Sequence, residues 1–154
     1  MNDGRGTRIG LIAGVLWSVI VVFGGIRLGA GTFMPPPIAL PGALIAPGLV
    51  LAAMIGRVAW AQGASDEQTS DSPAHMQHIL RNSVELAVLA LLVWPFVAVT
   101  LGGSVVLYMG LAFAVTRLAY WYGYNRSDYL RSFGFAATFL PTVLAGVWAL
   151  IVWV

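Results

Sequence analysis

The residues best suited to chemistry lie between positions 116 and 132, where arginines and tyrosines interrupt a largely apolar sequence. Arg117, Tyr120 and Tyr124 are spaced at i, i+3 and i+7, so they fall on one face of a helix. Arg131 follows a few residues later, at the start of the next apolar segment. Because charged side chains within a membrane span usually face a water-filled or protein-lined cavity, we expect the function to lie here.

The apolar segment before this stretch carries a second polar face. It consists of His78, Arg81, Asn82 and Glu85, at i, i+3, i+4 and i+7. A simpler interpretation is also open, in which Arg81 pairs with Glu85 and the tyrosines belong to an interfacial aromatic belt. In that interpretation Arg117 meets another carboxylate or a lipid phosphate.

Membrane-spanning helices must position these side chains, because the composition is not that of a soluble domain. Hydrophobic residues make up 59% of the chain and charged residues 9%, and the mean hydropathy is +0.85. We therefore expect an all-α integral membrane protein. Five spans of suitable length are predicted, at about residues 9–26, 41–62, 73–101, 104–124 and 131–154.

Breaks between the spans are marked by proline, glycine and polar residues. Successive prolines near residues 33–38 predict a loop, residues 63–74 are polar and acidic, and Gly102 with Gly103 predicts a tight turn. The first span could instead be a cleaved signal, since Arg5 and Arg8 precede it. Its apolar core is longer than the usual ~7–15 residues of a signal, which favours a retained helix.

Arginine placement predicts the orientation, because short cytoplasmic loops are enriched in basic residues. A cytoplasmic N-terminus leaves only Arg27 on the outer side. It brings to the inner face Arg5, Arg8, Arg57, Arg81, Arg117, Arg126 and Arg131. The chain has no lysine and is rich in alanine and glycine, so we expect a multi-pass protein of a bacterial inner membrane.

Several classes of function are disfavoured. The net charge of +2 is too small and too dispersed for nucleic-acid binding, and the absence of cysteine leaves no thiol nucleophile. His75 and His78 have no clustered third ligand, so we expect no metal site. No nucleotide-binding glycine loop appears. A transporter is disfavoured because the polar residues gather toward one membrane face.

Two ordered motifs resemble the membrane-associated proteins in eicosanoid and glutathione metabolism, the MAPEG family. They are Arg-Asn-x-x-Glu at 81–85 and Arg-x-x-Tyr-x-x-x-Tyr-x-Arg-Ser-x-x-Leu-Arg at 117–131, the second being most similar to the leukotriene-forming synthases. The resemblance extends over residues 39–154. It implies a MAPEG-like four-helix membrane domain at 38–154, with 1–37 as an additional N-terminal transmembrane helix and proline-rich loop.

The resemblance also implies a homotrimer that binds glutathione between subunits near the cytoplasmic face. The residues it assigns to glutathione binding are Arg57, His78, Arg81, Asn82, Glu85, Arg117, Tyr120, Tyr124 and Arg126. It assigns thiol activation to Arg131, with Ser132 beside it. His78 departs from the pattern, because many relatives have arginine there.

Elementary electrostatics supports such a role for Arg131. A free thiol has a pKa near ~8.5, so a dominant thiolate at neutral pH needs stabilisation by about 2.7 kcal/mol. One arginine about 4 Å from sulfur supplies on the order of 4 kcal/mol at an effective dielectric near ~20. Phe133, Phe135 and Phe139 would offer an apolar wall to a lipid-soluble partner.

We therefore predict a glutathione-dependent membrane transferase that acts on lipophilic electrophiles entering from the bilayer. Conjugation, peroxide reduction and isomerisation are all compatible with the motifs. The alternative is a non-catalytic MAPEG-like structural or accessory subunit.

Overall fold

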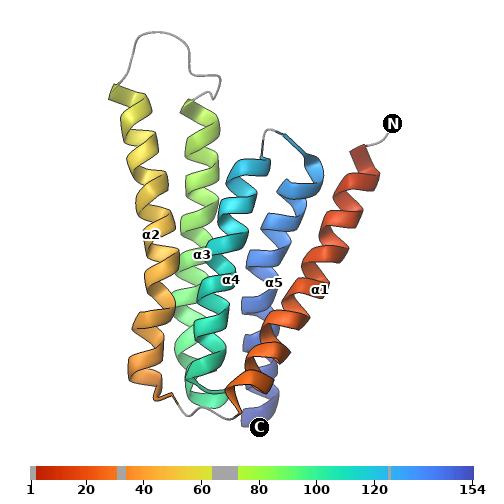
Figure 1. Ribbon diagram of the computed structural model, residues 1–154, viewed down its shortest axis with the longest axis vertical. Helices are drawn as coiled ribbons and strands as arrows, with labels where there is room; N and C mark the ends of the chain where they lie inside the picture. Colours follow the sequence, from red (N-terminus) through yellow and green to blue (C-terminus); the bar gives the residue numbers. More distant parts are fainter. Residues whose placement is uncertain (1–2, 31–33, 64–72, 125) are drawn as a thin grey trace.

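The fold is known from a computed structural model that describes residues 3–30, 34–63, 73–124 and 126–154 (Figure 1). The described residues form five helices and no strand. The helices are α1 (Asp3–Gly29), α2 (Pro36–Gly63), α3 (Pro73–Thr100), α4 (Gly103–Gly123) and α5 (Asp128–Trp153). Each is long and apolar enough to cross a membrane. The predicted all-α, five-span membrane fold is confirmed.

Several helices begin earlier than their apolar runs. α1 starts at Asp3 and not at residue 9, and α2 starts at Pro36 and not at residue 41. Proline is tolerated in the first turn of a helix, where its missing N–H would have no intrahelical partner. α5 starts at Asp128, one turn before the predicted start. Hydropathy marks the membrane-embedded part of a helix, whereas the hydrogen-bonded backbone continues into the polar ends.

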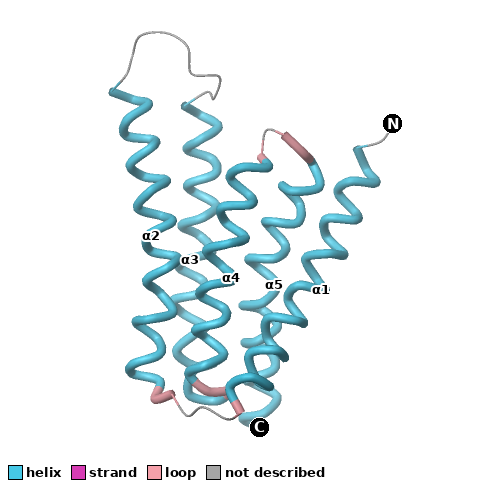
Figure 2. The backbone as a smooth tube through the Cα atoms, viewed as in Figure 1, coloured by secondary structure: helices cyan, strands magenta, loops and turns pink. Residues whose placement is uncertain are grey.

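The helices alternate in direction and pack side by side (Figure 2). α1 packs mainly against α5 and also against α4, whereas α2 packs against α3 and α4. The beginning of α1 lies at the same end of the bundle as the end of α4 and the beginning of α5, and the C-terminus lies at the other end (Figure 1). The polar segments of α3, α4 and α5 are thereby brought to one end.

Buried polar contacts join the three central helices. Trp94 of α3 donates from Nε1 to Thr142 Oγ1 of α5 at 3.2 Å. Thr116 of α4 and Thr138 of α5 share a hydrogen bond between their hydroxyls at 2.9 Å. These hydrogen bonds between side chains of different helices link α3, α4 and α5 at defined positions along the bundle. That alignment sets the positions of the side chains described next.

Candidate functional site

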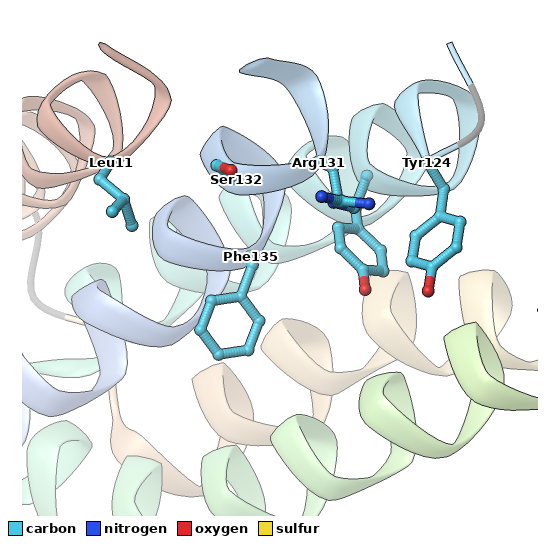
Figure 3. A pocket seen from close by; sticks show the side chains of 6 residues that line it. Leu11, Tyr124, Arg131, Ser132 and Phe135 are labelled. Atoms are coloured by element: carbon cyan, nitrogen blue, oxygen red, sulfur yellow. The ribbon is translucent and has the colours of Figure 1, made fainter. Parts of the chain in front are cut away.

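An open pocket of about 310 Å³ lies at the junction of α1, α4 and α5 (Figure 3). Its polar lining comes from Tyr120 of α4, from Tyr124 directly after α4, and from Arg131 and Ser132 of α5. Its apolar lining comes from Leu11 of α1 and Phe135 of α5. The volume is at the lower end of the range of small-molecule sites, which is roughly 300–1,000 Å³.

Arg131 lies in the first turn of α5, at the edge of the pocket. Its Nη2 is 3.0 Å from Asp128 Oδ1, and both side chains are partly exposed. Its guanidinium carbon is 5.9 Å from the ring centroid of Tyr124. A carboxylate and an aromatic ring therefore hold the guanidinium while it still reaches the pocket.

The two tyrosines form one aromatic wall. Their rings meet edge to face, with centroids 5.5 Å apart, and Tyr120 is the more buried of the two. Gly134 of α5 makes this possible, because a Cβ there would lie only 2.6 Å from Tyr120 Cβ. The absence of a side chain at Gly134 thus lets α5 bring Arg131 beside the phenols.

His78 of α3 lies beside this wall, with its ring centroid 6.5 Å from that of Tyr124. It does not line the pocket. The polar face of α3 therefore adjoins the pocket at Tyr124 without forming part of its lining.

Arg117 is fully buried and lies inside the bundle. It donates from Nη1 to Asn82 Oδ1 at 3.0 Å and to Ser83 Oγ at 3.3 Å. Its guanidinium carbon lies 4.8 Å from the ring centroid of Tyr120. Within the described part of the chain, Nε and Nη2 have no hydrogen-bond partner. Among the described residues, Arg117 thus donates to an amide and a hydroxyl, and not to a carboxylate.

Arg81 and Glu85 form the ion pair that their spacing allows, with Nε to Oε1 at 3.1 Å. Their side chains are 83% and 58% exposed. Both lie within the membrane span of α3, residues 76–100. Charged side chains on a lipid-facing surface are costly, so this surface is suited to contact with protein, water or a polar ligand.

Arg57 and Arg126 also lie outside the pocket lining. The guanidinium of Arg57 packs over Trp121, with its carbon 5.7 Å from the ring centroid. Arg126 donates from Nη1 to the Tyr122 hydroxyl and packs over the same ring. Both cations are held by aromatic rings on the last two turns of α4.

The pocket therefore gathers four of the predicted site residues, which are Tyr120, Tyr124, Arg131 and Ser132. The seven others lie on the surface of the bundle or in its interior. Of the three phenylalanines expected to form an apolar wall, Phe135 lines the pocket, Phe139 stacks on Phe135, and Phe133 stacks on Tyr129.

Leu11 is the lining residue that the sequence motifs did not indicate. It belongs to the helix that those motifs left outside the four-helix domain. The only signal in the sequence was the spacing of Gly10 and Gly14 beside it, which is typical of closely packed membrane helices.

The described residues contain no group of three His, Asp or Glu side chains that could hold a metal ion. The side chain of His75 lies outside the described part of the chain. A guanidinium, two phenols and a hydroxyl next to an apolar surface can instead stabilise an anion that reacts with an apolar partner.

Glutathione fits the donor set of the pocket in part. Its thiolate would find Arg131, Ser132 and the two phenols, whereas its carboxylates need cations that this pocket does not supply. Such cations lie on the neighbouring surface of α3, which carries Arg81.

Comparison with models of protein families finds a match to the MAPEG family over residues 9–151. The matched range begins within α1 and ends within α5, so it includes most of the helix that the two motifs left outside the four-helix domain. Comparisons with curated proteins and with solved structures find no match.

Proposed function

Because the chain belongs to the MAPEG family of membrane-associated proteins in eicosanoid and glutathione metabolism, we propose that it is a glutathione-dependent membrane transferase. Arg131 stabilises the glutathione thiolate, which attacks lipophilic electrophiles. The observation that carries this proposal is the convergence of Arg131, Ser132 and two phenols on one pocket beside Phe135.

The reaction is a nucleophilic substitution or addition at an electrophilic carbon. The thiol proton leaves to solvent, and the thiolate forms the new sulfur–carbon bond. In a substitution the leaving group departs with the bonding electrons. In an addition to an epoxide, the resulting alkoxide takes a proton from water or from the Ser132 hydroxyl. Arg131 lowers the barrier because it stabilises the reactive ionised form of sulfur.

The rest of glutathione would bind to the polar surface of α3 from a neighbouring subunit of a homotrimer. The exposed Arg81–Glu85 ion pair within the α3 span supports this arrangement, because a subunit interface with a bound tripeptide would remove the charges from lipid. The binding surface would consist of Arg57, His78, Arg81, Asn82, Glu85 and Arg126, with Tyr120 and Tyr124 in the pocket. Arg117 contributes indirectly, because it holds the amide of Asn82.

A non-catalytic role in the same membrane family is the second candidate. The Asp128–Arg131 ion pair favours it, because the carboxylate competes with a bound thiolate for the guanidinium. The side chains of the pair are 41% and 46% exposed, so solvent weakens their interaction and a ligand can reach Arg131.

Titration of the purified protein with glutathione tests the proposal, with the thiolate absorbance followed first and turnover of 1-chloro-2,4-dinitrobenzene second. We expect a thiolate signal in the unmodified protein. In Arg131→Ala we expect glutathione binding to remain and turnover to fall about 100-fold, which corresponds to a loss of about 2.7 kcal/mol. Unchanged turnover would remove Arg131 from the mechanism.

Two further variants complete this experiment. Arg27→Ala is the matched control, because Arg27 is an exposed arginine in the last turn of α1, far from the pocket. It should leave binding and turnover unchanged. Asp128→Asn removes the competing carboxylate and should increase the thiolate signal. Glutathione binding with no thiolate signal in any variant would support the non-catalytic alternative.

A further inference from the structure

The N-terminal helix forms one wall of the candidate active site. Leu11 lines the pocket from α1, on the side opposite Tyr124, with Arg131, Ser132 and Phe135 between them (Figure 3). Leu11 lies within the membrane span of α1, and its side chain is 43% exposed. A lipophilic molecule that approaches Arg131 from the apolar side of the pocket therefore passes Leu11.

Close backbone packing fixes the position of this wall. A Cβ on Gly10 would lie 2.6 Å from the carbonyl oxygen of Tyr129 and 3.1 Å from Ser132 Cβ. A Cβ on Gly14 would lie 2.5 Å from Ala136 Cβ. Because Gly10 packs directly on the helical turn that carries Ser132, its neighbour Leu11 is held at a set position relative to Arg131.

Two side chains form the apolar part of this open pocket. Its volume is only about 310 Å³, and its apolar lining consists of Leu11 and Phe135. Apolar side chains at a site discriminate between substrates by bulk, with about 10- to 200-fold effects for a single methylene group. An electrophile that reaches the sulfur must therefore fit between an aliphatic and an aromatic side chain.

We propose that α1 is a specificity element of the active site, in which Leu11 limits the bulk of the electrophile. The preferred class is a lipophilic electrophile whose reacting carbon ends an unbranched chain, and electrophiles with a bulky branched group next to that carbon are disfavoured. This inference rests on the proposed glutathione chemistry at Arg131.

The test compares Leu11→Ala and Leu11→Trp in the full chain, in lipid vesicles that contain glutathione. Each variant is assayed with two halides that share one leaving group, a primary n-alkyl halide and one with a bulky branched group next to the reacting carbon. We expect Leu11→Ala to raise kcat/KM about tenfold for the bulky halide with little change for the n-alkyl halide. Leu11→Trp should lower kcat/KM for both.

Leu16→Ala and Leu16→Trp are matched controls, because Leu16 is an exposed leucine of the same helix that does not line the pocket. Glutathione binding, measured by the thiolate absorbance, should be the same in all four variants and shows that each is folded. An unchanged ratio of kcat/KM for the two halides in Leu11→Ala, with normal turnover, would overturn the specificity role of α1 but not the proposed function. The absence of turnover in the unmodified protein would overturn both this inference and the proposed function.

Discussion

Arg117 holds α3 and α4 together from inside the bundle. Its fully buried guanidinium donates to Asn82 and Ser83 of α3 while it lies over Tyr120 of its own helix. A hydrogen bond from a charged donor contributes more than one from a neutral donor, about 1.5–3 kcal/mol. Arg117 therefore sets the position of Asn82 and of one wall of the pocket, although it does not line the pocket itself.

Replacement of Arg117 by methionine should reduce the stability of the bundle. The amide oxygen of half-buried Asn82 and the hydroxyl of buried Ser83 would lose this donor, which costs about 1–3 kcal/mol. Arg27→Met is the matched control, because Arg27 is an exposed arginine in the last turn of α1 and its replacement should change the stability by less than about 0.5 kcal/mol. Unfolding in detergent by heat or denaturant measures the difference. Equal losses in the two variants would show that the buried contacts do not stabilise the bundle.

The spacing of residues in the sequence could predict which side chains share a helix face. It could not predict every residue that those side chains contact on other helices. Tyr120 and Tyr124 line one pocket with Arg131, because a short link leads from the end of α4 into α5. The interior contact of Arg117 could not be predicted, since it depends on how α3 and α4 are rotated against each other. The Asp128–Arg131 pair was not predicted because it requires α5 to begin at Asp128.

At the scale of the elements, α1 packs mainly against α5. Gly10 and Gly14 face the backbone and the small side chains of α5, whereas a Cβ on Gly24 would have nothing within 4 Å. The spacing of Gly10 and Gly14 is typical of closely packed membrane helices, but no feature of the sequence indicates that α5 is the helix they pack against. The sequence therefore predicted the existence of α1, but neither its full length nor its contribution to the pocket.

Gly10→Leu should separate α1 from α5 or displace the turn that carries Ser132. Overpacking of this kind costs roughly 1–3 kcal/mol, so we expect a lower unfolding temperature in detergent together with weaker turnover. Gly24→Leu introduces the same side chain into the open part of the same helix and should change neither property. A Gly10→Leu protein as stable and active as the Gly24→Leu protein would contradict the close packing of α1 on α5.

At the scale of the whole molecule, the alternating helices separate two chemically different ends. The polar segments of α3 and α4 and the first turn of α5 lie at the end where α1 begins (Figure 1). Arg117, Arg126 and Arg131 belong to this end, and Arg27 lies near the other. The sequence could predict this topology because five spans joined by short links must alternate in direction. The number of arginines at each end then predicts which end faces the cytoplasm.

Because basic residues favour the cytoplasmic side, we predict that the end with the pocket faces the cytoplasm. The chain contains no cysteine, so a single introduced thiol reports one position. Ser127→Cys places it between α4 and α5, and Met34→Cys places it just before α2, at the opposite end. A membrane-impermeant maleimide added to intact cells should label Met34→Cys alone, and permeabilised cells should show labelling of both. Labelling of Ser127→Cys alone in intact cells would reverse the orientation and place the candidate active site on the outer face, away from cytoplasmic glutathione.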